Sequence, residues 1–370
     1  MHLDFGIILP LWAFAAGDDD LLERAVGEVG VSHITVPVVT GPTTRYRLHS
    51  GGGPHYFHTE GGWHFPPRGE LYRSHAARPH AAGWFGRKNV LTKLADEAAR
   101  RGVPWIARID PRSAPALLAH APHLATVNEW GEAELGGKPC VLNPELGELL
   151  HELVEDLKGY DVGGVELAGW TLSATRPVRF SAGGWDAQRQ RLLDLCFCPF
   201  CRRVADAAGA DADATARSVQ VELGRLLASD EPPRAIPDAL IMRYAAAREQ
   251  DARNWLTRFA RQIPGKRFLS LHLPGTLEFG GPPAEWNPLR ILEHEPIATV
   301  LAEAADSSNA VSIPSCRPWV GSPDALFTVV RAAAASGVRF FDFAGADEST
   351  PEAVDWIRRA VRFVHREFDQ

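Results

Sequence analysis

Three of the five cysteines lie within six positions of one another, in the segment 196–201 (CFCPFC). A C-x-C-x-x-C spacing can direct three sulfur atoms at one point, and tetrahedral zinc takes four such ligands at about 2.3 Å. The fourth sulfur must come from elsewhere in the chain, from Cys140 or Cys316. An odd number of cysteines is not typical of a disulfide framework. Metal binding is therefore favoured over three reduced thiols that only pack.

Acidic residues stand at the ends of several predicted strands, where two of them could work as a pair. Glu166 lies near the end of a buried apolar run, and Asp110 and Asp342 stand in similar positions. A glycosidase needs two carboxyl groups, about 5 Å apart for retention of configuration or about 6.5–9.5 Å apart for inversion. We expect Glu166 to be one of them and Asp342 or Asp110 to be the other, with Asp347 and Glu278 as loop alternatives. The competing interpretation is that these acids pair with arginines or cap helices, which for Asp110 carries equal weight.

Histidine and aromatic side chains are dense in the segment 40–89 and recur beyond several predicted strands. Aromatic faces stack on the apolar faces of sugar rings, while polar side chains satisfy the hydroxyl groups. Contacts with a sugar or another polar ligand are preferred over ordinary loop packing, and a second metal site is the least favoured interpretation. The candidate substrate-binding residues are Trp12, Trp63, His64, Tyr72, Trp170, His272 and Trp319.

Short apolar runs alternate with longer helical patterns along the chain, which is typical of a parallel sheet covered by helices. Asn143-Pro144 and Ser322-Pro323 are typical helix starts. A (β/α)8 TIM-type barrel with one strand unrecognised fits the length better than an open doubly wound sheet. The predicted strands are 3–11, 32–39, 104–109, 162–170, 267–273, 310–314 and 338–343. The predicted helices are 20–29, 91–101, 145–158, 248–262, 297–305, 323–336 and 351–368.

Two long insertions interrupt this alternation, and we expect residues 1–370 to form a single barrel domain that carries them. Residues 40–89 follow the second strand, and residues 171–243 follow the fourth strand and contain the cysteine cluster. Within the second insertion, the stretch 208–234 is rich in Ala, Asp and Pro and is expected to be a long loop. Loops that follow barrel strands gather at the carboxyl-terminal face, where active sites are built. This placement favours an enzyme.

Composition and charge disfavour several other classes of protein. The chain has 39 Lys and Arg against 46 Asp and Glu and a formal net charge of −7 at pH 7, so a nucleic-acid partner is not expected. No apolar run approaches the ~18 residues of a membrane span, so no membrane partner is expected either. The amino terminus lacks the basic region of a secretion signal, and the expected location is the cytoplasm. Neither a Gly-rich dinucleotide fingerprint nor a P-loop occurs, which disfavours nucleotide-dependent chemistry.

The segment from Cys140 to the C-x-C-x-x-C motif, about a sixth of the chain, resembles family 42 β-galactosidases and related barrel-fold glycoside hydrolases. Those proteins carry one cysteine before an Asn-x-Pro-like helix start, comparable to Cys140-Val-Leu-Asn-Pro-Glu here, and then C-x-C-x-x-C. The resemblance implies a catalytic acid at the end of the fourth strand, where Glu166 lies. The β-galactosidases have an Asn-Glu pair at that point, whereas this chain has Val165-Glu166. The resemblance also implies a structural zinc ion held by Cys140, Cys196, Cys198 and Cys201.

The predicted function is cleavage of a glycosidic bond in a small glycoside or oligosaccharide, with Glu166 as general acid/base and a second carboxylate as its partner. One alternative is a carbohydrate-binding barrel without catalysis. Another is a metal-dependent sugar isomerase or lyase that would use His272 and loop histidines around an open metal. Each alternative takes a small carbohydrate as its partner. Family 42 enzymes are often oligomeric, so the resemblance is compatible with a homo-oligomer.

Overall fold

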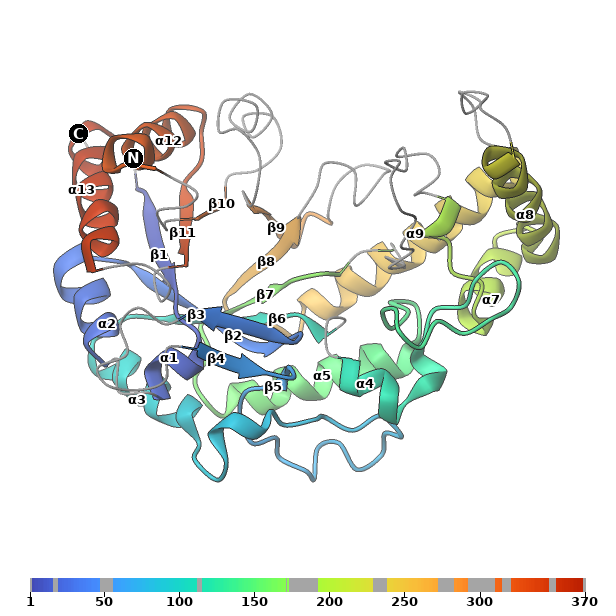
Figure 1. Cartoon of the computed structure of the whole chain (residues 1–370), viewed down its shortest axis with the longest axis horizontal. Helices are drawn as coiled ribbons and strands as arrows, with labels where there is room; N and C mark the ends of the chain where they lie inside the picture. Colours follow the sequence, from blue (N-terminus) through green and yellow to red (C-terminus); the bar gives the residue numbers. More distant parts are fainter. Residues whose placement is uncertain are drawn as a thin grey trace.

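A computed structural model describes residues 2–15, 19–46, 56–111, 115–170, 172, 192–228, 238–271, 283–291, 310–314, 321–345 and 351–368. In this part of the chain, eight parallel strands form a closed barrel, because the first strand pairs with both the second and the last (Figure 1). A further short strand, β5 (Gly62–Trp63), pairs antiparallel with the end of the second barrel strand. The barrel strands are β1 (Asp4–Ile8), β2 (His33–Thr40), β6 (Trp105–Ile109), β7 (Gly164–Leu167), β8 (Lys266–Leu271), β9 (Asn287–Ile291), β10 (Ala310–Pro314) and β11 (Phe340–Ala344). The predicted (β/α)8 barrel is therefore confirmed, and the unrecognised strand is β9.

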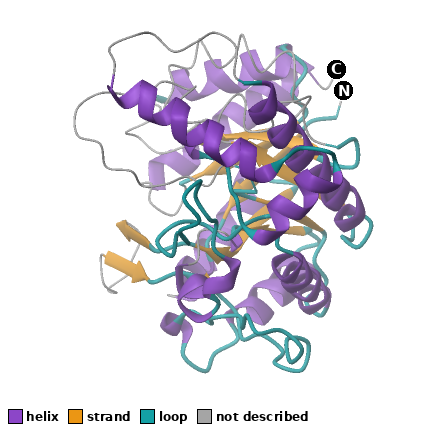
Figure 2. Ribbon diagram, turned by 90° about the vertical axis from the view of Figure 1, so that its right-hand side faces the viewer, coloured by secondary structure: helices purple, strands orange, loops and turns teal. Residues whose placement is uncertain are grey.

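Helices surround the strands, as Figure 2 shows in purple around orange. Two of them begin where the sequence predicts. The Asn143 side chain accepts a hydrogen bond from the Glu145 backbone N–H at 3.0 Å, and the Ser322 side chain accepts one from Ala325 at 3.1 Å. Each cap satisfies an amide that the first helical turn leaves unpaired. The helices are α1 (Leu11–Ala15), α2 (Asp19–Glu23), a π-helical segment η1 (Arg24–Val29), two 3-10 turns η2 (Gly83–Phe85) and η4 (Pro122–Leu124), α3 (Val90–Arg100), α4 (Pro115–His120), α5 (Pro144–Lys158), α7 (Pro199–Ala207), α8 (Ala212–Ala228), α9 (Ala239–Ala260), α12 (Pro323–Ala335) and α13 (Pro351–Phe368).

The described part of the stretch 208–234, residues 208–228, is not the long loop that its composition suggested. It contains the helix α8, which covers Ala212–Ala228. Alanine has the highest intrinsic helix propensity, and here that propensity outweighs the acidic and turn-forming residues nearby. The helix predicted at 248–262 is also longer than expected, because α9 begins at Ala239 after the Asp238 cap. The predicted helix at 297–305 lies outside the described residues.

The segment between β2 and α3 contains a two-stranded hairpin of β3 (Thr43–Tyr46) and β4 (Tyr56–Thr59) beside the barrel (Figure 1). The segment between β7 and α9 carries the cysteine motif, α7 and α8. These helices lie at the far side of the molecule from α12 and α13, which lie near both chain ends. The long insertions predicted after the second and fourth strands are thus present.

The amino-terminal half of the barrel interior is filled by an apolar layer. Its residues are Ile106, Phe268, Leu289, Ala310 and Phe340. The Phe340 ring lies 4.2 Å from the Phe268 ring and 4.2 Å from the imidazole of His33. The adjacent strand β1 has Gly6 at this level, where a Cβ atom would lie only 2.0 Å from Nε2 of His33. Gly6 therefore makes room for the histidine ring. This layer closes the interior below the polar side chains described next.

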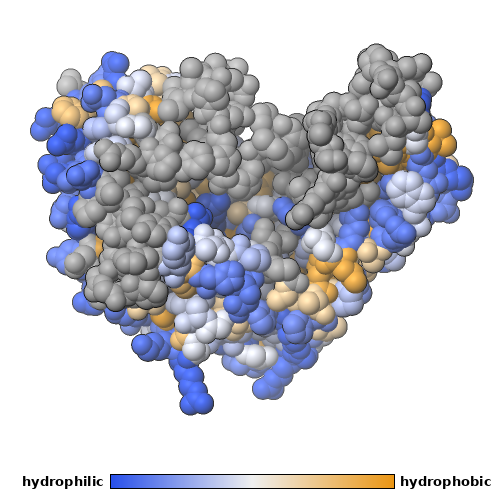
Figure 3. All heavy atoms as spheres, viewed as in Figure 1, coloured by the Kyte–Doolittle hydropathy of each residue, from blue (hydrophilic) through white to orange (hydrophobic). Residues whose placement is uncertain are grey.

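The outer surface is mixed in character. On the face drawn in Figure 3, hydrophilic residues dominate the described surface, with smaller hydrophobic areas between them. Within the described residues, no helix combines the length and the hydropathy that a membrane-spanning segment requires.

Candidate active site and metal centre

Two residues further along the strands, toward their carboxyl ends, the barrel interior becomes polar. Because side chains alternate along a strand, residues two apart face the same side, so Ser270 follows Phe268 and Asp342 follows Phe340. We call this set the polar layer; it consists of Thr35, Arg108, Glu166, Ser270, Ser312 and Asp342. All except Arg108 are about 1% exposed. A layer of buried polar groups costs free energy unless its members bind one another or a ligand.

Glu166 lies at the centre of the contacts within the polar layer. Its Oε1 atom lies 3.4 Å from Nε of Arg108, which is the neighbouring residue on β6, and it also accepts a hydrogen bond from the Ser270 hydroxyl group. Its Oε2 atom has no hydrogen-bond partner in the described part of the chain. Arg108 balances the charge of this carboxylate, and Ser270 orients it. One oxygen therefore stays available to another group.

Asp342 faces Glu166 from strand β11. Burial, and then the negative charge of Glu166, raise the pKa of the Asp342 carboxyl group to about 8, although a hydrogen bond from Thr35 and the charge of Arg108 oppose the shift. Like charges held close together in a buried site cannot both ionise easily. The Asp342 carboxyl group therefore keeps its proton at neutral pH, and its Oδ1 atom has no hydrogen-bond partner among the described residues.

Asp110 lies one step above Arg108, directly after β6, and is partly buried. It approaches the backbone beyond β7 closely, since a Cβ atom on Gly169 would lie 2.6 Å from Oδ1 of Asp110. Gly169 also has a φ of +64°, which favours glycine. Asp110 therefore lies at the carboxyl end of the barrel, above the polar layer rather than in it.

Two predicted substrate-binding tryptophans lie just after barrel strands. Trp12, in α1 after β1, stacks on Phe57 of the hairpin with 4.8 Å between ring centroids. Trp170, after β7, stacks on Trp255 of α9 at 4.5 Å. Both are at least 95% buried, and the Nε1 atoms of both lack a hydrogen-bond partner within the described part of the chain. Trp63, on β5, is completely buried.

His64 is fully engaged in a chain of hydrogen bonds. Nε1 of Trp84 donates to Nδ1 of His64 at 2.7 Å, so the proton of the neutral ring is on Nε2, which lies 2.7 Å from the Thr40 hydroxyl oxygen. That hydroxyl in turn donates to the Gly41 carbonyl oxygen at 3.0 Å. Burial lowers the pKa of His64 to about 4, which keeps the ring neutral. Both nitrogens therefore serve the insertion after β2.

Tyr72 has a similar supporting position. Its hydroxyl group donates to Oδ2 of the fully buried Asp156 at 3.2 Å, and Nε of Arg68 binds Oδ1 of the same carboxylate at 2.8 Å. Burial and the charge of Asp156 raise the pKa of Tyr72. These bonds tie the first insertion to helix α5. Four other candidates from the sequence and the alternative cysteine lie outside the described residues, namely His272, Glu278, Cys316, Trp319 and Asp347.

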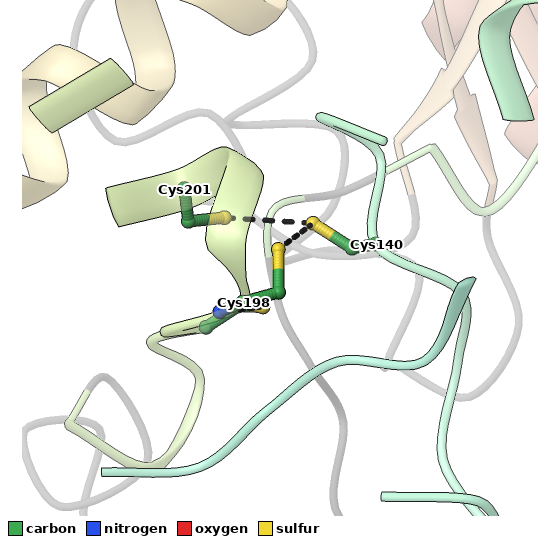
Figure 4. A group of neighbouring side chains, drawn as sticks. Cys140, Cys198 and Cys201 are labelled. Atoms are coloured by element: carbon green, nitrogen blue, oxygen red, sulfur yellow. Dashed lines mark hydrogen bonds between the residues drawn. The ribbon is translucent and has the colours of Figure 1, made fainter. Parts of the chain in front are cut away.

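The four remaining cysteines form one buried cluster, within 4.8 Å of one another in the described part of the chain. The sulfur of Cys140 lies 3.5 Å from that of Cys201 and 3.6 Å from that of Cys198 (Figure 4). Four sulfurs about 2.3 Å from a tetrahedral ion would lie about 3.8 Å apart, so the cluster has suitable dimensions for such an ion. Hydrogen bonds with Cys140 and Cys201 lower the pKa of the Cys198 thiol, although the one with Cys196 opposes the shift, and burial raises the pKa of Cys201.

The surroundings of the cluster also suit thiolate ligands. The backbone N–H groups of Val127 and Cys198 point to the sulfur of Cys196 at 3.4 and 3.5 Å. The Tyr244 hydroxyl group, on α9, donates to the Cys196 carbonyl oxygen at 2.8 Å. Donors of this kind stabilise negative sulfur and hold the ligand loop in place. The residues therefore fit a metal ion in a closed four-sulfur site.

The candidates predicted from the sequence did not include Arg108, Ser270 and Thr35, nor Arg248, a buried arginine on α9. For the first three, a signal was present, since each is a polar residue at an inward-facing position of an otherwise apolar strand. Arg248 gave no signal, because a single arginine on a helix is usually exposed.

No protein-family model matches the chain, and no curated protein sequence is similar to it. Among solved structures, it is similar to α-L-fucosidase isoenzyme 2 from Paenibacillus thiaminolyticus, with 15% identity, a TM-score of 0.54, and coverage of 99% of this chain and 49% of that one. It is also similar to β-galactosidase from Bacillus circulans sp. alkalophilus, with 9% identity, a TM-score of 0.53, and coverage of 99% and 56%. The chain thus spans about half the length of these two proteins. At such identities the likeness shows the barrel fold alone.

Proposed function

We propose that the protein is a glycoside hydrolase that cleaves a glycosidic bond in a small glycoside or oligosaccharide, with Glu166 and Asp342 as its pair of carboxyl groups. The observation that carries this proposal is the contrast between the two acids. Asp342 keeps a proton to about pH 8, while Glu166 lies against the guanidinium of Arg108. Acid-assisted glycoside cleavage requires one carboxyl group that keeps a proton to donate and a second carboxyl group in the same site.

The electrostatics favour Asp342 as the general acid and Glu166 as the nucleophile or base. Asp342 would protonate the leaving oxygen, and the unpartnered Oε2 of Glu166 would act on the sugar carbon or on a water molecule. The indole N–H groups of Trp12 and Trp170, which lack partners among the described residues, would donate to sugar hydroxyls. Asp110 would bind substrate at the barrel mouth. The two hydrolases with similar folds support this class of reaction by analogy only.

The test is hydrolysis of aryl glycosides, including α-L-fucosides and β-D-galactosides, by wild type, Glu166→Gln and Asp342→Asn. We expect both variants to lose about 10²- to 10⁴-fold in kcat/KM, the usual contribution of a general acid or base. Glu367→Gln, which removes an exposed acid paired with Arg331, is the matched control and should keep full activity. Full activity of folded Glu166→Gln would remove this residue from the chemistry.

The near-complete burial of Glu166 and Asp342 favours a second candidate, a carbohydrate-binding barrel without catalysis. This candidate predicts that wild type binds a sugar in calorimetry but hydrolyses none of the glycosides. The isomerase or lyase alternative requires a second, open metal site. Among the described residues, the four cysteines are the single group that could hold an ion, and they leave no open position for water.

We also propose that the cysteine cluster holds zinc in a structural role. Four thiolates suit zinc, and a closed tetrahedral site stabilises a fold without taking part in the reaction. Metal analysis of protein purified without chelators should give about one zinc per chain, and Cys198→Ser should lower this content. Metal-free wild type would overturn the proposal.

A further inference from the structure

A buried arginine links the cysteine cluster to the barrel. Arg248 lies on α9, one turn after Tyr244, and is only 2% exposed. Residues four apart on a helix share one face, and Tyr244 binds the Cys196 carbonyl oxygen. The Arg248 side chain therefore lies on the face of α9 that covers the cluster. A fully buried cation is rare unless it is paired.

The counter-charge for Arg248 comes from sulfur. Burial, the largest single influence, lowers the pKa of its guanidinium, whereas negative charge on the surrounding groups, Cys201 and Cys196 foremost, together raises it, so that the net shift is upward. Nε of Arg248 has no hydrogen-bond partner among the described residues. A divalent ion held by four thiolates leaves two net negative charges, and one buried guanidinium halves that excess.

The opposite end of the same group reaches the chain beyond strand β7. Nη2 of Arg248 donates to the Leu172 carbonyl oxygen at 3.3 Å. Leu172 is two residues after Trp170 and six after Glu166. Further along α9, Trp255 stacks on Trp170. One helix thus contacts both the sulfur cluster and the segment that leaves the strand of Glu166.

We propose that Arg248 supports the metal centre in two ways. Its charge balances the charge of the four-thiolate complex, and its hydrogen bond to the Leu172 carbonyl oxygen holds the segment after β7 next to that complex. This inference rests on the zinc centre proposed above. It makes Arg248 a positioning residue with two separable roles, one through its charge and one through its hydrogen bond to Leu172.

The test is competition for zinc between a chromophoric chelator and the full-length protein, with cobalt(II) substitution to report tetrahedral thiolate ligation. Arg248→Met keeps the length of the side chain and removes its charge, and it should weaken zinc binding about 10- to 100-fold, as loss of a partner of a metal ligand usually does. Arg248→Lys keeps the charge, and its affinity for zinc should be closer to that of wild type. Arg243→Met, on the exposed face of the same helix, is the matched control and should bind zinc as wild type does.

Hydrogen exchange of residues 164–172 tests the second role and needs no variant that risks misfolding. Removal of zinc from wild type should speed exchange in this segment, and Arg248→Lys should speed it even with zinc bound. If Arg248→Met binds zinc as tightly as wild type, the charge role is overturned while the metal centre stands. If zinc removal leaves this exchange unchanged, the link to β7 is overturned. If wild type binds no zinc, both the metal centre and this inference fail.

Discussion

The apolar layer and the polar layer of the barrel interior share the strands β6, β8, β10 and β11, on which their residues lie two apart, and they bury very different side chains. In the apolar layer, rings such as Phe268 and Phe340 lie in contact at 4.2 Å. In the polar layer, Glu166 and Asp342 each leave an oxygen without a hydrogen-bond partner among the described residues. Such an atom costs about 1–3 kcal/mol when buried. The difference indicates that the first layer stabilises the fold, whereas the second layer keeps polar atoms that the proposed function would use to contact a substrate.

His33 is the exception that clarifies this contrast. It lies beside the apolar layer, and its Nε2 atom also lacks a partner in the described part of the chain. Burial lowers its pKa to about 3, so the imidazole ring is neutral and stacks on the Phe340 ring. The pKa of Asp342 is raised, which also keeps that group neutral. Neutrality suits His33 to packing, whereas in the proposed enzyme it would give Asp342 a proton to donate.

The largest expected effect is a pH dependence of stability that originates in the polar layer. The Asp342 pKa is about 8 in the folded protein against an ordinary 3.8, so the folded state binds more protons between about pH 4 and 8. This contribution is complete below about pH 4 and is lost as pH rises to about 8, by at most about 6 kcal/mol. Asp342→Asn cannot titrate and should remove this dependence in urea unfolding measured across that range.

Asp355→Asn is the control for this prediction, because Asp355 forms an exposed ion pair with Arg358 and such pairs contribute little. It should preserve the pH dependence of wild type. If Asp342→Asn and wild type show the same slope of stability with pH, Asp342 does not hold its proton in the folded state, and its role as general acid fails as well.

Truncation of the apolar layer should cost nearly as much, but independently of pH. Phe340→Ala removes the ring that contacts both Phe268 and His33. The lost burial and the cavity should lower the free energy of unfolding by about 3–5 kcal/mol. Phe363→Ala, at a ring that is 53% exposed on α13, should cost far less in the same urea titration. Equal losses for the two variants would mean that the apolar layer is not the packed floor of the barrel.

The sequence was sufficient to predict the barrel, the three clustered cysteines and Glu166, but it left Cys140 or Cys316 as the fourth cysteine until the family resemblance chose Cys140, and it left Asp342 or Asp110 as the second acid. Each of these features has a local signal, such as strand–helix alternation, the C-x-C-x-x-C spacing, or an acid within an apolar strand. The sequence did not show, however, that Arg108 and Ser270 would both contact Glu166. Arg108 and Ser270 come from two other strands, and their contacts with Glu166 depend on the register of three parallel strands.

The histidines of the first insertion show a second limit of prediction from sequence. Their density predicted ligand contacts, yet His64 uses both ring nitrogens on Trp84 and Thr40. Trp84 and Thr40 lie 20 and 24 residues away from it in the chain. A sequence shows which groups can form hydrogen bonds, but only the folded chain shows which of them are already satisfied.

The smallest of the expected effects concerns the orientation of Glu166 within the polar layer. Ser270→Ala removes the hydroxyl group that donates to Oε1 of Glu166, and a hydrogen bond to a charged group contributes about 1.5–3 kcal/mol. Arg108 still balances the charge, so the loss of stability should lie at the lower end of that range. In the proposed enzyme, Ser270→Ala should lower kcat more than it raises KM, because a misdirected carboxylate weakens the transition state more than binding.

Ser312→Ala is the matched control for Ser270→Ala. Ser312 is equally buried in the polar layer, and the hydrogen bonds that the structure describes for Glu166 do not include it. Its removal should leave kcat unchanged. If the two serine variants lose the same activity, the polar layer acts through its general polarity. If only Ser270→Ala loses activity, Glu166 depends on a specific donor, and the polar layer differs from the apolar layer in being built around one oriented carboxylate.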